Sequence, residues 1–192
     1  MLNKKFDTRK LVTCAILTAL VIVLQSMGAF IRFGTFSVSL VLVPIVIGAA
    51  VCGIWAGAWL GFVFGLVVLF TDSALFMAVS VPGTIITVLL KGILAGLASA
   101  VVYRLASKVN TTVGTVAAAF ICPVVNTGVF LIGCNIFFMQ TITQWGAAAG
   151  FESAGKYLIF GMVGVNFLLE LAVNMILSPI LVRLISIRKK NV

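Results

Sequence analysis

Two charged side chains lie inside long apolar stretches of this sequence, where they are its strongest chemical signal. Lys91 stands in the apolar segment 82–104 and Glu170 in the segment 157–186. Charges inside a membrane are costly, so they pair with each other or mark the path of a substrate. At about 1.5 Å per residue, Lys91 would lie roughly 13 Å and Glu170 roughly 20 Å below the outer ends of their segments. These depths allow an ion pair, which could be purely structural or could belong to a binding site.

Each charge belongs to a polar stripe along one face of its helix. The first stripe has i, i+3, i+7 spacing and the second has i, i+4, i+8 spacing, so the members of each stripe share a face. Two such stripes turned toward each other would line a cavity, whereas helix packing alone would rarely need six polar side chains. The expected lining residues are Thr84, Thr87 and Lys91 from one helix, with Asn166, Glu170 and Asn174 from the other.

The segment 112–138 offers two further amides. Asn126 and Asn135 are nine residues apart, which is about 900° of rotation and places them on opposite faces of a straight helix. Only one of them can therefore face a common cavity. Asn135, near the outer end, suits a site open to the exterior. We expect Asn126, beside Pro123, to bond to a neighbouring helix or to a backbone group that the proline leaves free.

The connections between segments add two candidate ligand-binding residues. Arg32 follows the first segment, and Trp145 lies between the fifth and the sixth. Loops of this kind can cover a pocket. The alternatives are that Arg32 binds lipid headgroups and that Trp145 is an interfacial tryptophan of an ordinary loop.

Most catalytic chemistry is excluded by what the chain lacks. It has no histidine, so histidine-based triads and zinc motifs cannot form, and no phosphate-binding loop is present. Its four acidic residues are scattered, which leaves no carboxylate pair for acid–base catalysis. We therefore predict no catalytic residues, no metal site, no cofactor and no enzymatic activity. Any work driven by ATP would be done by another polypeptide.

Composition identifies the elements that must position these groups. Of 192 residues, 62% are hydrophobic and 9% are charged, whereas soluble domains carry roughly 25% charged residues. We predict an all-α integral membrane bundle, a single domain over residues 1–192, with six transmembrane helices. The expected spans are 10–31, 37–53, 55–71, 82–104, 112–138 and 157–186.

Charge distribution predicts the orientation of this bundle. Most of the 13 Lys and Arg residues lie before the first span, after the fourth or after the last. Positive charge is enriched on the cytoplasmic side of membrane proteins, so both termini are expected in the cytoplasm. The net charge of +9 does not form a stripe interleaved with exposed aromatic residues, so nucleic-acid binding is not predicted.

Cysteines and small residues complete the pattern. Four cysteines, all inside apolar stretches and without CxxC spacing, are interpreted as buried free thiols. Small residues recur every four positions in three of the helices, which allows close backbone approach. They could pack within this bundle or dock a partner subunit. They are Ala15 and Ala19 in the first span, Gly57, Gly61 and Gly65 in the third, and Gly92, Gly96 and Ala100 in the fourth.

Over nearly its whole length the chain resembles the S components, the substrate-binding subunits of energy-coupling-factor (ECF) vitamin importers. The resemblance rests on chain length, six spans with cytoplasmic ends, the missing ATPase and the order of four short motifs. These are Ala15-Ile-Leu-Thr-Ala19, Pro44-Ile-Val-Ile-Gly-Ala49, Lys91-Gly-Ile-Leu-Ala-Gly96 and Asn126-Thr-Gly.

The resemblance implies a division of labour in a bacterial cytoplasmic membrane. Ala15 and Ala19 correspond to the family's surface for the transmembrane coupling subunit. Spans four to six would bind a vitamin or related molecule from outside, and two ATPases would drive its delivery inward. Lys91 would suit pantothenate, while the Asn, Thr and aromatic groups would suit a riboflavin-like vitamin. The alternatives are a stand-alone secondary transporter, in which Lys91 and Glu170 relay protons, and a non-transporting membrane assembly protein.

Overall fold

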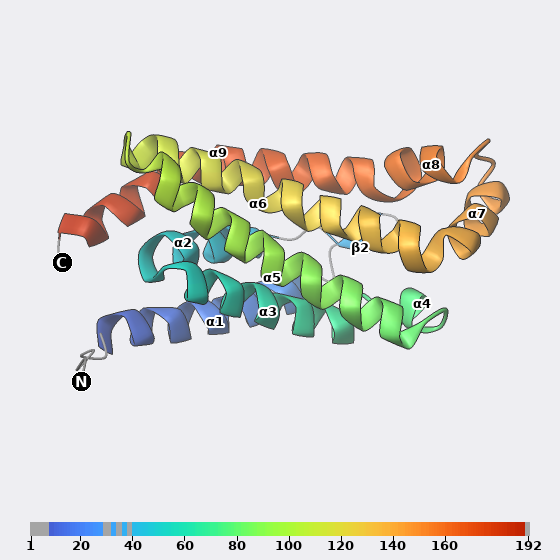
Figure 1. The fold of residues 1–192 in the computed structure, drawn as a ribbon, viewed down its shortest axis with the longest axis horizontal. Coiled ribbons are helices and arrows are strands. Elements are labelled where there is room, and N and C mark those ends of the chain that lie inside the picture. Colours follow the sequence, from blue (N-terminus) through green and yellow to red (C-terminus); the bar gives the residue numbers. More distant parts are fainter. Residues whose placement is uncertain (1–7, 29–31, 34–35, 38–39, 191–192) are drawn as a thin grey trace.

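The structure is a computed structural model that describes residues 8–28, 32–33, 36–37 and 40–190. Long helices lie side by side along one direction, and the first and last of them begin and end at the same end of the bundle (Figure 1). The elements are α1 (Thr8–Gly28), β1 (Arg32–Phe33), β2 (Phe36–Ser37), α2 (Leu42–Cys52), α3 (Ile54–Thr71), α4 (Ala74–Met77), α5 (Val81–Ala106), α6 (Thr111–Gly133), the π-helical η1 (Cys134–Phe138), α7 (Met139–Ala148), α8 (Ala154–Lys156), the π-helical η2 (Tyr157–Val163) and α9 (Gly164–Lys190).

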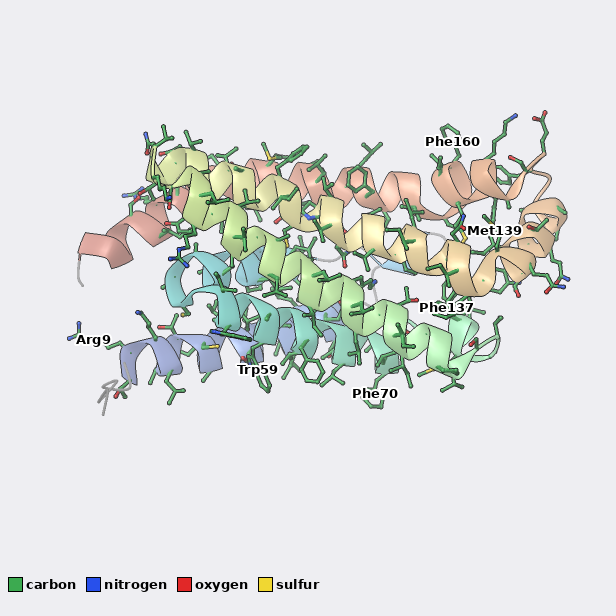
Figure 2. The ribbon with its side chains drawn as sticks, in the orientation of Figure 1. Arg9, Trp59, Phe70, Phe137, Met139 and Phe160 are labelled. Carbon is green, nitrogen blue, oxygen red and sulfur yellow. The ribbon has the colours of Figure 1, made fainter. Side chains whose placement is uncertain are left out.

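The predicted all-α membrane bundle is confirmed. Within the described part, strand structure is limited to β1 and β2, which pair antiparallel over two residues each. Large apolar side chains cover the outside of the bundle, as a lipid-facing surface requires. Phe70 and Phe160 are 89% and 72% exposed, and both point away from the helices around them (Figure 2).

The number of full-length spans differs from the prediction. Five helical stretches of the described chain are long and apolar enough to cross a membrane, namely 8–28, 54–71, 81–106, 111–148 and 166–183. Within the described part of the second predicted span, 37–53, the helix is confined to the 11 residues of α2. Such a helix is about 16 Å long, whereas the hydrocarbon core is about 30 Å thick.

The ends of α2 have local causes. Pro44 lies in the first turn of the helix, where its missing N–H has no intrahelical partner to lose. At the other end, Gly53 has a φ of +100°, a backbone conformation that residues other than glycine rarely adopt. This residue lets the chain reverse directly from α2 into α3.

The glycine stripes of α3 and α5 face each other, so the intramolecular interpretation of these stripes is confirmed. A Cβ added to Gly61 would overlap the carbonyl oxygen of Gly92, and one on Gly57 would lie 2.6 Å from the carbonyl oxygen of Gly96. The two backbones are therefore in direct contact along this crossing. Without Cβ atoms at these positions, α5 can approach closely enough to place Lys91 against α3.

We expect Gly61→Ala to lower the free energy of unfolding by about 1–3 kcal/mol, because the new methyl group meets backbone that cannot move aside. Gly128→Ala is the matched control, since nothing lies within 4 Å of a Cβ added at that position of α6. This control should be neutral or stabilising by up to about 1 kcal/mol. Thermal unfolding in detergent measures both variants, and equal melting temperatures would contradict the close crossing.

The buried apolar residues form two separate clusters. One surrounds α2, where Val41, Leu42, Ile45 and Val46 are fully buried against the neighbouring helices. The other lies toward the end away from the termini and joins Phe76 of α4 to residues of η1, α7 and η2.

All four cysteines are free thiols, as predicted. However, only Cys122 and Cys134 are buried. Cys14 and Cys52 are half-buried, because Cys14 lies on the sparsely buried α1 and Cys52 is the last residue of α2.

Candidate functional site

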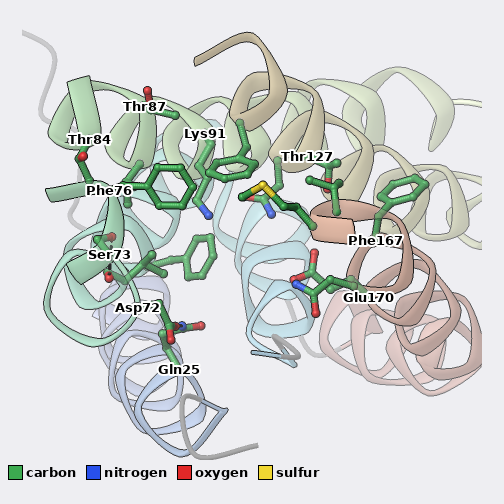
Figure 3. Close-up of a pocket in the computed structure, with 18 of the residues that line it drawn as sticks. Gln25, Asp72, Ser73, Phe76, Thr84, Thr87, Lys91, Thr127, Phe167 and Glu170 are labelled. Atoms are coloured by element: carbon green, nitrogen blue, oxygen red, sulfur yellow. Dashed lines mark hydrogen bonds between the residues drawn. The ribbon is translucent and has the colours of Figure 1, made fainter. Parts of the chain in front are cut away.

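A partly open cavity lies among α1, α3, α4, α5, α6, η1, η2 and α9 (Figure 3). It encloses about 770 Å³ of empty space when its open mouth is included. Its wall combines a charged and amide-bearing part with an aromatic part. The aromatic part consists of Phe64, Phe76, Phe130, Phe138 and Phe167.

Lys91 projects from α5 into this cavity (Figure 3). Its ammonium nitrogen lies 5.2 Å from the ring centroid of Phe130 and 5.6 Å from that of Phe64. Two cation–π contacts, worth about 0.5–2 kcal/mol each, stabilise the charge. They leave its N–H donors without a hydrogen-bond acceptor among the described residues. The ammonium can therefore donate to a molecule in the cavity.

Glu170 of α9 is 4% exposed and lines the same cavity. The ion pair considered between Lys91 and Glu170 is not formed, since no salt bridge within 4.0 Å joins these two described residues. The two side chains approach the cavity from different sides (Figure 3). They face a common space instead of closing it.

The two predicted polar stripes meet at this cavity, with one exception. Thr84, Thr87 and Lys91 from α5 line it together with Asn166 and Glu170 from α9. The exception is the last member of the second stripe. Asn174 is fully buried one turn further along α9, outside the cavity wall, and its amide donates to the carbonyl of Glu170 at 2.8 Å.

The expected roles of the two amides of the third segment are reversed. Asn126 is 5% exposed and lines the cavity, whereas Asn135 is exposed and lies outside the cavity wall. The inference that only one of them could face the cavity holds. The choice between them was wrong because the buried face of α6 is the one that packs against α5, where a Cβ on Gly133 would overlap Thr87. Asn126 is seven residues from Gly133 and so shares its face.

Three side-chain oxygens in the cavity wall have no hydrogen-bond partner among the described residues. They are Thr87 Oγ1, Asn126 Oδ1 and Asn166 Oδ1. A buried polar atom without a partner costs about 1–3 kcal/mol. Functional cavities carry this cost because a ligand can supply the hydrogen bonds. The expectation that Asn126 bonds to a neighbouring helix is therefore not met.

Two groups that the sequence analysis missed also line the cavity. Gln25 of α1 is 1% exposed, and its Nε2 donates to Oδ2 of Asp72 at the end of α3, at 2.8 Å. Gln25 continues a buried stripe with Leu17 and Val21 at four-residue spacing, and that spacing is the signal that could have found it. Asp72 directly follows α3, outside the predicted spans, and lines the cavity.

The two loop candidates have different outcomes. Trp145 lies in α7, outside the cavity wall, where its ring packs edge-on against Phe76 at 5.8 Å. Because Phe76 lines the cavity, Trp145 supports the wall from behind. For Arg32, only the backbone in β1 is described, so the predicted role of its side chain lies outside the described residues.

Residues 9–182 match the family described as the substrate-specific component of ECF transporters. The chain belongs to this family. The resemblance seen in the sequence is thus confirmed. The protein is an S component, a membrane transport subunit of a class that binds substrate and is not a class of enzyme. No curated protein matches the chain.

Helix α1 of this S component has two contrasting faces. Its buried face is narrow, and only 17% of its most apolar 18-residue stretch lies inside the bundle. Ala15 and Ala19 lie on the broad exposed face. Their methyl side chains are small enough to allow another helix to approach closely. Toward the other end of the same helix, Gln25 reaches the cavity wall.

Proposed function

We propose that this S component captures a vitamin or related small molecule from outside a bacterial cytoplasmic membrane and delivers it inward. It would act with a transmembrane coupling subunit and two ATPases, since the chain has no ATP-binding loop of its own. The observation that carries the proposal is the cavity at Lys91. There, an ammonium group held only by cation–π contacts and three side-chain oxygens from α5, α6 and α9 have no hydrogen-bond partner among the described residues.

The lining of the cavity supports a ligand with both polar and apolar parts. Lys91 would donate to a carboxylate or a ring carbonyl, and the oxygens of Asn126 and Asn166 would accept from hydroxyl or N–H groups. The phenylalanines of the wall would cover the apolar part of the ligand. Pantothenate and a riboflavin-like vitamin both have these features and are the proposed substrates.

The direction of transport is proposed from the position of the cavity. Helix α5 begins at the end of the bundle away from the termini (Figure 1), and Lys91 lies ten residues from its first residue. With the basic ends of the chain in the cytoplasm, the cavity would lie in the outer half of the membrane. A solute could then enter from outside without crossing the apolar core around α2.

Mass spectrometry of small molecules retained by the gently purified protein tests this function directly. We expect one retained vitamin-sized compound, together with co-purification of a coupling subunit and two ATPases. Uptake by vesicles that lack ATPases would instead support a secondary transporter. If no compound is retained and neither vitamin raises the melting temperature, the cavity is structural and the proposal is wrong.

The reversed roles of the two amides give a matched pair of variants. We expect Asn126→Leu to weaken vitamin binding about three- to tenfold, since it removes one hydrogen bond worth about 0.5–1.5 kcal/mol. Asn135→Leu makes the same change on the exposed face of η1 and should leave the affinity unchanged. Titration calorimetry with the retained compound measures both. A larger loss in Asn135→Leu would mean that the ligand binds elsewhere.

A further inference from the structure

Helix α1 is the element that joins the cavity to the exposed alanine face. Gln25 is the only α1 residue in the cavity wall, and Ala15 and Ala19 lie further along the same helix on its exposed side. A rise of about 1.5 Å per residue places Gln25 only about 9 Å along the axis from Ala19. Any shift of α1 caused at Gln25 would therefore move the alanine face as well.

Among the described residues, side-chain hydrogen bonds connect α1 to α3 and to Asp72 at its C-terminal end. Near the middle of α1, Trp59 Nε1 donates to Thr18 Oγ1 at 3.1 Å. In the cavity wall, Gln25 Nε2 donates to Asp72 Oδ2 at 2.8 Å. The second bond has a charged acceptor and is almost fully buried on the Gln25 side, so it is the stronger of the two. It is also the bond that a molecule in the cavity can contact, because both of its residues line the cavity.

We propose that the Gln25–Asp72 hydrogen bond transmits occupancy of the cavity to α1, and so sets how well the exposed alanine face binds the coupling subunit. This inference rests on the proposed function. A ligand beside Lys91 contacts the wall that contains Asp72 and changes the hydrogen bonding of its carboxylate. Gln25 follows Asp72, and α1 is shallowly packed enough to move. Gln25 is thus a positioning residue that acts on the partner surface through the helix.

Linkage gives this idea a measurable form. If the ligand changes the affinity for the coupling subunit, the coupling subunit must change the affinity for the ligand by the same factor. We expect this factor to be about fivefold or more in the unmodified protein. This factor should depend on the Gln25–Asp72 bond and should be independent of the Trp59–Thr18 bond.

The test compares Gln25→Met with Trp59→Phe. Gln25→Met removes the hydrogen bond from Gln25 Nε2 to Asp72, and Trp59→Phe removes the one from Trp59 Nε1 to Thr18, while each keeps a side chain of similar size. Binding of the purified coupling complex is measured with and without saturating riboflavin or pantothenate, whichever stabilises the protein. In Gln25→Met the ratio of the two affinities should fall to about one, and this ratio is the readout because Gln25 lines the cavity and its loss can also change ligand affinity of the isolated subunit. Trp59→Phe should keep the ratio of the unmodified protein.

Two further arms keep the outcome decisive. Gln25→Asn retains the amide but is one methylene too short, so it should behave like Gln25→Met even if the methionine variant folds poorly. Thr127→Trp fills the cavity from α6 and needs no ligand. It should change coupling-complex affinity in the Trp59→Phe background but not in the Gln25→Met background. An unchanged ratio in both Gln25 variants would overturn the inference while leaving the proposed function intact. Absence of any ligand or coupling complex would contradict the proposed function itself.

Discussion

Replacing Lys91 by methionine should weaken vitamin binding by about ten- to a hundredfold. A charge-assisted hydrogen bond contributes about 1.5–3 kcal/mol, and 1.4 kcal/mol corresponds to a factor of ten in affinity. Methionine keeps the length of the side chain, and its sulfur can pack against the rings of Phe64 and Phe130, so the fold should survive. Calorimetric titration of the purified variant with the retained vitamin measures the loss.

Lys156→Met is the control for this experiment. Lys156 lies in α8, is more than half exposed and pairs with Glu152 on the surface, so its removal should leave the affinity unchanged. Lys91→Arg adds a second comparison, because it keeps the charge with a different geometry and should retain part of the binding. Unaltered affinity in Lys91→Met would show that the ammonium has a purely structural role.

Tryptophan at Ala15 or Ala19 should abolish vitamin uptake by cells while leaving binding to the isolated S component within about twofold. Both alanines are exposed on α1, and a smooth helix face permits close approach of another membrane helix, which an indole ring prevents. The cavity contains no residue from this face, so the ligand should not sense the change. Radiolabelled uptake and equilibrium binding measure the two effects separately.

Ala172→Trp tests whether bulk alone causes the loss. Ala172 is an exposed alanine of α9, so the same substitution adds the same ring to a different membrane-facing surface. Uptake should be normal in this variant. Normal uptake in Ala15→Trp and Ala19→Trp would place the partner surface on another helix.

The helices were predictable because their apolar lengths and spacings follow directly from the sequence. The second segment was the exception. Apolar residues continue through 37–53, yet the helix begins only at Leu42. Hydropathy measures how well a segment suits lipid, and it does not say whether the backbone is helical. The polar stripes of α5 and α9 were found for the same reason as the long helices, since their periodicity is visible in one sequence.

The remaining site residues depended on how each helix is rotated in the bundle. Nothing in the depth of Asn126 and Asn135 tells which of them turns inward. That choice follows from the contact between Gly133 and Thr87, which brings α6 against α5. Asp72 and Gln25 were missed because their importance arises from the meeting of two helix ends that are 47 positions apart in the chain. Such meetings are products of tertiary packing.

The shortness of α2 separates its role from that of the longer helices. Its buried residues Leu42, Ile45 and Val46 belong to the cluster around α2, and no described residue of α2 lines the cavity. The groups that meet a cargo therefore come from the other helices. They can vary from one cargo to another while α2 keeps its packing.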